Sequence, residues 1–220
     1  MGLRERKKAE TRAALAWAAV RLIVERGYDK VLVEDIAEEA GVSPRTFNNY
    51  FSSKAAAVAS RHLDRSLRMA EGLRARPAGE DLWTAITEAV VAEMNPGPEV
   101  TSQPRPDRET WGPGLQQMMA TPAIQAETLR AAAIAEQELA RAVGERVGLD
   151  PVDDMYPGLV AATVTAAFNV ASQRYASLRF SGPGDPDRSI RELLVDALSQ
   201  VAAGLPPPVD NGKKLSDPGA

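Results

Sequence analysis

Apolar residues recur three or four positions apart through most of the chain, a spacing that places them on one face of an α-helix. Glycine and proline interrupt the pattern, so we expect the helices to end where these residues stand. No run of alternating apolar and polar residues indicates a strand, and the chain is therefore predicted to be all-α. The predicted helices cover residues 5–26, 33–40, 44–51, 52–74, 80–94, 107–119, 121–147, 153–180 and 187–203.

The second and third of these helices are short and are separated by a tight turn. Gly41 can adopt the left-handed conformation that closes a helix, Ser43 can cap the next helix, and Pro44 suits a first helical position. The apolar residues that would pack this pair inward are Val42, Phe47 and Phe51. The residues left on the exposed side are Arg45, Thr46, Asn48, Asn49 and Tyr50. This layout is typical of a DNA-reading helix-turn-helix.

The pattern divides the chain into three parts. Residues 1–54 are predicted to form a three-helix, helix-turn-helix DNA-binding head. Residues 55–204 are predicted to form a helical body that binds an effector and dimerises. Residues 205–220 contain Pro206, Pro207 and Pro208 in a row, and this composition predicts a disordered tail.

Charge is distributed unevenly between these parts, although the net charge is only −4. Residues 1–54 hold 10 basic and 8 acidic side chains, a net +2, whereas residues 55–220 hold 16 and 22, a net −6. The basic side chains at the N-terminus are Arg4, Arg6, Lys7, Lys8 and Arg12. This polarity suits a molecule that presents one end to phosphates.

Several classes of protein are excluded by composition. The chain has no cysteine and a single histidine, His62, so disulfides, thiolate chemistry and clustered metal ligands are not expected. No nucleophile motif or phosphate-binding glycine loop is present, so we expect neither enzyme activity nor a cofactor or metal. The charged N-terminus does not resemble a signal peptide, and residues 157–173 are too short to span a membrane. A cytoplasmic protein without a membrane partner is predicted.

The segment from Thr11 to Lys54 resembles the TetR family of bacterial transcriptional regulators. The resemblance is carried, in order, by Gly27-Tyr28, Val33-Glu34-Asp35-Ile36-Ala37, Ala40-Gly41-Val42-Ser43, Thr46-Phe47, Tyr50-Phe51 and Ser53-Lys54. It implies a ligand-responsive repressor that leaves a palindromic operator when a small apolar effector binds. The stretch 43–47 is similar to that of actinobacterial members that respond to acyl or acyl-coenzyme A ligands. Leu32, Asn48 and Ala55 depart from the usual pattern. Leu32 and Ala55 stand at helix starts, whereas Asn48 replaces an aromatic residue of the reading helix, so the operator sequence does not carry over.

The side chains of the third helix suit contacts with a double-stranded DNA operator. Arg45 can bind guanine O6 and N7, and Asn48 or Asn49 can bind adenine N6 and N7. The place of Thr46, Tyr50 and Lys54 in the motif predicts phosphate contacts, next to Ser43 and Pro44 at the helix start. Arg4, Arg6, Lys7 and Lys8 are predicted to form a flexible basic arm that reaches DNA. The alternatives are a solvated Arg45, a core role for the Tyr50 ring and a frayed, solvated N-terminus.

The body is expected to form a homodimer, because one head alone buries too little surface for specific binding. The resemblance places the dimer seam on the last two helices, with Leu159, Val160, Val164, Ala167, Phe168 and Ala171, then Ile190, Leu193, Leu194, Ala197, Leu198 and Val201. The alternative is that these residues are monomer core. Effector-binding candidates are the apolar Trp83, Met94, Trp111, Met118, Met119 and Phe168, because soft apolar side chains suit an apolar ligand. Asn169, Gln173 and Arg174 are candidates to orient a polar head group. Apolar side chains at this spacing belong to a core more often than to a pocket.

A second function class fits the helical body. A helical interaction or scaffold protein without specific DNA binding would explain the amphipathic body helices, but it would leave the Gly41–Phe51 segment unexplained. Salt-sensitive binding to a palindromic duplex separates the two hypotheses.

Overall fold

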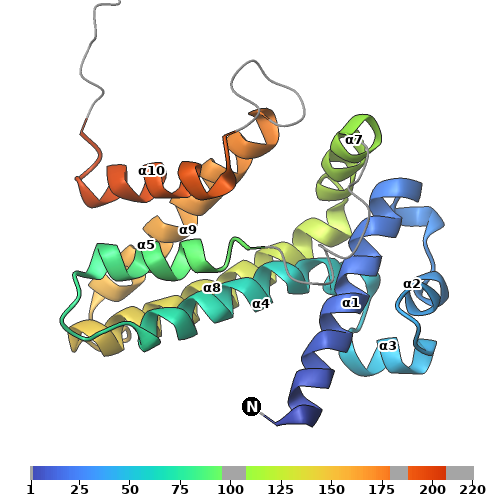
Figure 1. The fold of residues 1–220 in the computed structure, drawn as a ribbon, viewed down its shortest axis with the longest axis horizontal. Coiled ribbons are helices and arrows are strands. Elements are labelled where there is room, and N and C mark those ends of the chain that lie inside the picture. Colours follow the sequence, from blue (N-terminus) through green and yellow to red (C-terminus); the bar gives the residue numbers. More distant parts are fainter. Residues whose placement is uncertain (1, 96–107, 179–187, 207–220) are drawn as a thin grey trace, which may run out of the picture.

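The computed structural model describes residues 2–95, 108–178 and 188–206, and within these ranges it contains helices and no strand (Figure 1). The prediction of an all-α fold is confirmed. The α-helices are α1 (Leu3–Arg26), α2 (Val33–Glu39), α3 (Pro44–Tyr50), α4 (Lys54–Ala75), α5 (Leu82–Ala92), α7 (Arg108–Met119), α8 (Pro122–Val147), α9 (Met155–Ala176) and α10 (Ile190–Ala202), and a short 3-10 helix, η1 (Tyr28–Lys30), follows α1. Most of the predicted tail, from residue 207 on, lies outside the described residues.

The first hydrophobic core, which we call the head core, joins α1, α2, α3 and the start of α4, and it also includes Met118 of α7 and Ile124 of α8. Its largest fully buried side chains include Leu15, Leu22, Ile23, Ile36 and Phe47. Apolar residues on α1 and α3 therefore fix the short helix α3 against the long one. Burial of these side chains is the main stabilising contribution to the head.

Local backbone chemistry sets the turn between α2 and α3. Gly41 has a φ of +68°, which glycine adopts without the steric cost of a Cβ atom. Ser43 caps α3 by accepting a hydrogen bond from the Thr46 N–H at 3.1 Å. At the start of α2 Leu32 cannot cap, and the Asp35 carboxylate instead accepts a hydrogen bond from the Leu32 N–H at 2.8 Å. These contacts hold α3 in one orientation.

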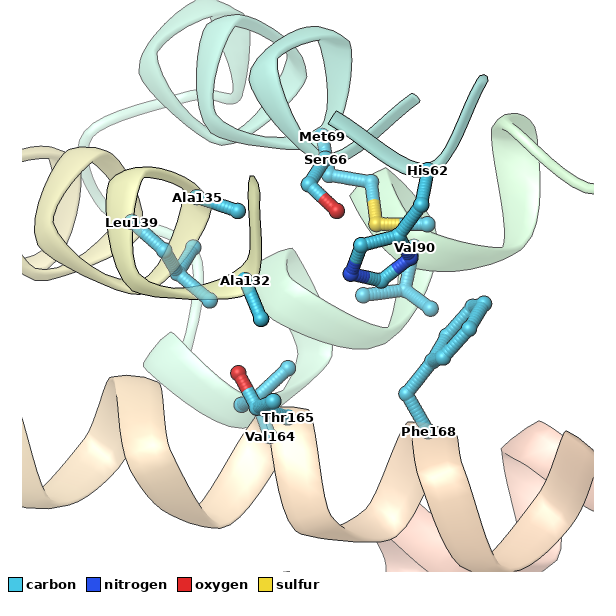
Figure 2. A pocket seen from close by; sticks show the side chains of 10 residues that line it. All are labelled: His62, Ser66, Met69, Val90, Ala132, Ala135, Leu139, Val164, Thr165 and Phe168. Carbon is cyan, nitrogen blue, oxygen red and sulfur yellow. The ribbon is translucent and has the colours of Figure 1, made fainter. Parts of the chain in front are cut away.

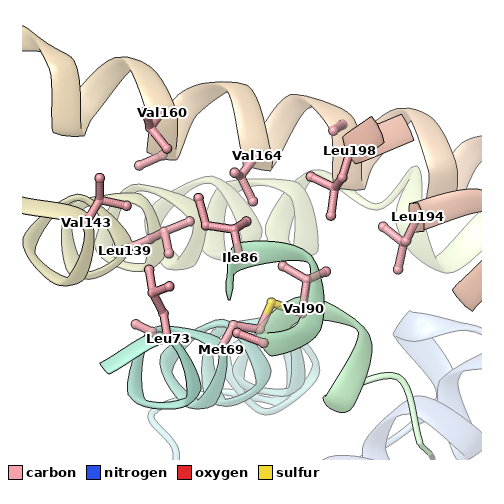
Figure 3. Packing of buried hydrophobic residues seen from close by; sticks show 14 of the residues in the cluster. Met69, Leu73, Ile86, Val90, Leu139, Val143, Val160, Val164, Leu194 and Leu198 are labelled. Atoms are coloured by element: carbon pink, nitrogen blue, oxygen red, sulfur yellow. The ribbon is translucent and has the colours of Figure 1, made fainter. Parts of the chain in front are cut away.

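The second hydrophobic core, the body core, lies between α4, α5, α8, α9 and α10 (Figure 3). Figure 3 shows Met69 and Leu73 of α4 facing Leu139 and Val143 of α8, with Ile86 of α5 close by. At one end, Arg74 of α4 forms ion pairs with Glu138 at 2.9 Å and Glu145 at 2.7 Å. Helices α4 and α8 consequently form one long, rigid pair.

Most of the apolar residues predicted at the dimer seam belong to this body core. On α9 the buried ones are Val160, Val164, Ala167 and Ala171, and on α10 they are Leu193, Leu194 and Leu198. The monomer-core alternative therefore holds for them. Leu159, by contrast, is 61% exposed.

Helix α7 packs against α1, although the two helices are far apart in the sequence (Figure 1). The Trp111 and Trp17 ring centroids are 5.6 Å apart, and Met118 is buried in the head core. A Cβ atom placed on Gly114 would lie 2.3 Å from the Val24 carbonyl oxygen. The two helix backbones approach closely because Gly114 has no side chain.

Substitution of Gly114 with alanine is therefore expected to destabilise the protein by about 1–3 kcal/mol, since the clash is with backbone that cannot move aside. Thermal or urea unfolding measures the loss. Gly72→Ala in α4 is the matched control, because its Cβ would meet Ala89 Cβ at an ordinary 3.5 Å and alanine favours a helix. Equal unfolding free energies for the two variants would contradict the close packing of α7 on α1.

Candidate nucleic-acid interface and body cavity

Helix α3 presents a polar face to solvent. Phe47 is fully buried, while Arg45, Asn48 and Asn49 are exposed. Positions 45, 48 and 49 are three and four residues apart, so these side chains share one face of the helix. The three predicted base-reading residues thus lie together on the exposed side of α3, whose opposite side is packed into the head core by Phe47.

The residues at the two ends of α3 are half-buried or take part in the helix cap. The Ser43 and Thr46 hydroxyls lie 2.9 Å apart in a shared hydrogen bond, so one of the two protons remains free for an acceptor such as a phosphate oxygen. The Tyr50 ring lies 6.3 Å from the Phe51 ring. The Tyr50 ring therefore packs against the head core, which agrees with the core alternative and leaves the predicted phosphate contact of its hydroxyl open.

Lys54 holds the start of α4 to the turn after α1. Its ammonium group donates hydrogen bonds to the Tyr28 carbonyl at 2.5 Å and the Val31 carbonyl at 2.8 Å. It also lies 4.1 Å from the centroid of the Tyr28 ring, a cation–π contact. Two of its three donors are used inside the protein. The predicted phosphate contact of Lys54 depends on the third.

The basic N-terminal residues belong to a helix. Because α1 begins at Leu3, the prediction of a flexible arm is wrong. Arg4, Arg6, Lys7 and Lys8 are exposed on its first two turns. Arg4, Lys7 and Lys8 share one face by their spacing, and their contact with DNA stays a prediction.

The head is fastened to α4 by charged side chains. The Arg12 guanidinium binds the Asp64 carboxylate twice, at 2.8 and 3.1 Å, and it lies 4.7 Å from the centroid of the Phe51 ring. One turn away, the Arg61 guanidinium lies 4.9 Å from the centroid of the Trp17 ring. A displacement of this part of α4 would therefore move α1 with it.

A cavity lies between α4, α5, α8 and α9, with about 420 Å³ of atom-free space that includes its open mouth (Figure 2). It is lined by His62, Ser66, Met69, Val90, Ala132, Ala135, Leu139, Val164, Thr165 and Phe168. The His62 and Phe168 rings lie 6.0 Å apart across it. Burial lowers the pKa of His62 below its ordinary value, and the neighbouring Arg65 guanidinium lowers it further.

Of the predicted effector-binding residues, Phe168 lines this cavity. Trp83 and Met94 pack against the body core, whereas Trp111 and Met118 belong to the head core. The remaining four, Met119, Asn169, Gln173 and Arg174, are exposed. The cavity is also lined by His62, Ser66 and Thr165, which were not predicted from the sequence. The first two could have been found from their spacing with Met69, which puts all three on one face of α4.

The described part of the chain offers neither a metal cluster nor a membrane span. Within residues 2–95, 108–178 and 188–206, no three histidine, aspartate or glutamate side chains gather as metal ligands. Every helix in these ranges is too short or too polar to cross a lipid bilayer.

Comparison with known proteins gives two family matches along the chain. Residues 17–59 match the model of bacterial regulatory proteins of the tetR family, and residues 80–206 match the MftR C-terminal domain. The HTH-type transcriptional regulator TcmR of Streptomyces glaucescens is 34% identical over 179 residues, which cover 79% of this chain and 76% of TcmR. The HTH-type regulator YvdT of Bacillus subtilis is 41% identical over 73 residues, or 31% of this chain and 36% of YvdT.

Solved structures have the same fold at low identity. A TetR-family regulator from Rhodococcus sp. superposes with a TM-score of 0.53 at 21% identity, covering 90% of this chain and 100% of that one. The fatty acid degradation regulator FadR of Bacillus halodurans gives a TM-score of 0.55 at 16% identity, covering 89% and 96%. Such likeness speaks for the fold alone, and an acyl or acyl-coenzyme A effector stays a prediction.

Proposed function

This chain is a transcriptional regulator of the TetR family, and from that premise we propose that it binds a palindromic operator as a homodimer and releases it when a small apolar effector enters the body cavity. The observation that carries the proposal is the exposed face of α3, with Arg45, Asn48 and Asn49 on a helix fixed by the buried Phe47. An arginine and two asparagines supply the donors and acceptors that read guanine and adenine in the major groove. Such a protein would work in the cytoplasm, where the genomic DNA is.

A second copy of the chain would cover the outer side of α9. Exposed apolar residues recur there at helical spacing and form what we call the α9 stripe: Met155, Leu159, Ala162, Ala166 and Val170. Met155 and Leu159, on adjoining turns, are 81% and 61% exposed, and Val170 near the other end of the stripe is 63% exposed; a contiguous exposed apolar surface of this kind marks an interaction site. Pairing through the α9 stripe would bring two heads together, as a palindrome requires.

Helix α4 offers a physical route from the cavity to the head. It carries His62 and Ser66 at the cavity and Lys54, Arg61 and Asp64 at the contacts with the head. An effector that binds more tightly when α4 is in one position would shift the population of molecules toward that position. Because α4 contacts the head, the distance between the two heads of the dimer would change with it. A spacing that misfits the operator would lower the affinity for DNA.

The salt dependence of DNA binding tests the proposed function. If each head places Arg4, Lys7, Lys8 and Lys54 on phosphates, a dimer makes about eight such contacts, and log affinity should fall with log salt at a slope of about −7. Anisotropy titrations use a duplex selected from the organism's genome and a random duplex as control. A slope near zero, with equal affinity for both duplexes, would contradict the proposal and favour a helical scaffold protein.

A further inference from the structure

Two polar side chains face the body cavity without a hydrogen-bond partner among the residues that the structure describes. They are His62 and Ser66, one turn apart on α4, and both project toward the space between α4 and α9 (Figure 2). The third polar lining group, the Thr165 hydroxyl, already donates to the Ala161 carbonyl at 3.0 Å. The unused hydrogen-bonding capacity of the cavity is therefore concentrated on one side, on α4.

The rest of the lining is apolar and carries no charge. The apolar lining residues are Met69, Val90, Ala132, Ala135, Leu139, Val164 and Phe168, and no carboxylate, lysine or arginine is among the lining residues. A charged group would lose its hydration here without gaining a counter-charge, which makes its binding costly.

Arg65 acts electrostatically on His62 but does not line the cavity. The nearby Glu93 carboxylate, just beyond α5, attracts Arg65 and forms an ion pair with Arg68 at 2.6 Å. Burial, and then the charge of Arg65, keep the pKa of His62 low. A neutral imidazole offers one N–H donor and one nitrogen acceptor.

We propose that the cavity takes an uncharged, mainly apolar molecule that carries one hydroxyl or carbonyl group, and that His62 and Ser66 form the hydrogen bonds that orient it. This assignment rests on the proposed function, in which the cavity receives the effector. A wholly apolar ligand would leave both polar side chains buried and unpaired, which costs affinity.

Three probes with one ring system and different substituents test the assignment: naphthalene, β-naphthol and β-naphthoate. His62 is the only histidine in the chain, so its imidazole resonances in the NMR spectrum of the full-length protein report on this cavity without ambiguity. We expect β-naphthol to shift these resonances saturably. Naphthalene should bind about three- to tenfold more weakly, the worth of one or two neutral hydrogen bonds, and β-naphthoate should bind more weakly still.

Variants separate hydrogen bonding from packing. His62→Phe keeps a ring but removes both nitrogens, and Ser66→Ala removes only a hydroxyl. Each is expected to lower the affinity for β-naphthol about three- to tenfold without weakening naphthalene binding. Thr165→Val is the matched control, because its hydroxyl donor is already used within α9, and it should change the affinity less than either.

Three results would overturn the assignment. In the first, β-naphthoate is the tightest ligand, which would indicate an anion site at Arg65. In the second, no probe binds up to its solubility limit. In the third, β-naphthol binds but does not shift the His62 resonances. DNA binding by the ligand-free protein is measured separately. Salt-sensitive operator binding with any of these results rejects only the effector class, whereas the predicted probe selectivity without DNA binding rejects only the proposed function.

Discussion

Substitution of Ala166 with glutamate is expected to leave a monomer whose affinity for the operator is at least about a hundredfold lower. Ala166 is exposed within the α9 stripe, between Ala162 and Val170. In a two-fold interface the same surface meets itself, so one substitution buries two like charges that lack a partner. A monomer contacts only one half-site and loses half of the phosphate and base contacts. Light scattering after size exclusion measures the mass, and anisotropy measures the affinity.

Ala133→Glu is the matched control for this experiment. Ala133 is also an exposed alanine within a long helix, but it lies on α8, outside the α9 stripe. This variant should remain a dimer with unchanged affinity. If Ala166→Glu also stays dimeric, or becomes monomeric and keeps its affinity for DNA, the assignment of the α9 stripe as the dimer interface is wrong.

Arg45→Ala is expected to lower the affinity for the operator about thirtyfold or more and to relax specificity at one base pair in each half-site. A bidentate arginine–guanine contact discriminates by about 1–3 kcal/mol, and a dimer makes it twice. Random duplex, bound mainly through phosphates, should lose much less affinity. Competition between the operator, single-base variants and random duplex measures the difference.

Arg130→Ala provides the comparison for charge alone, because Arg130 is an exposed α8 arginine paired with Glu127 at 2.7 Å. It should bind all sequences as the unmodified protein does. An equal loss for the operator and for random duplex in Arg45→Ala would show that Arg45 contacts phosphate and does not read a base.

The sequence predicted the helix-turn-helix well because its signals are local. Gly41, Ser43 and Pro44 act on the backbone within a few positions, and the structure has the turn and the cap where these residues indicate them. The Thr46 N–H reaches the Ser43 hydroxyl whatever the rest of the chain does. The ends of α4, α8 and α10 follow the same rule, since Pro77, Gly148 and Gly204 stand just beyond them, whereas α7 continues through Gly112, Pro113 and Gly114.

The parts that the sequence did not predict depend on contacts between distant segments. Helical spacing shows that Trp111 and Met118 have an inward face, but it does not show that this face meets α1 in the head core. Nor does it distinguish Val160 and Val164, which face α8, from Leu159 on the opposite side of α9. The cavity was not predicted, because several of its lining side chains are small. A cavity forms where side chains from different helices do not fill the space between them, and no sequence motif indicates this.

Methylation interference with dimethyl sulfate on a genome-selected fragment tests most directly whether the polar face of α3 enters the major groove. The reagent modifies guanine N7 in the major groove and adenine N3 in the minor groove, so one experiment reports on both. We expect modified guanines at symmetric positions in two half-sites to block binding, and we expect Arg45→Ala to abolish interference at one of them per half-site. Interference only at adenine N3, or at no base, would contradict the account.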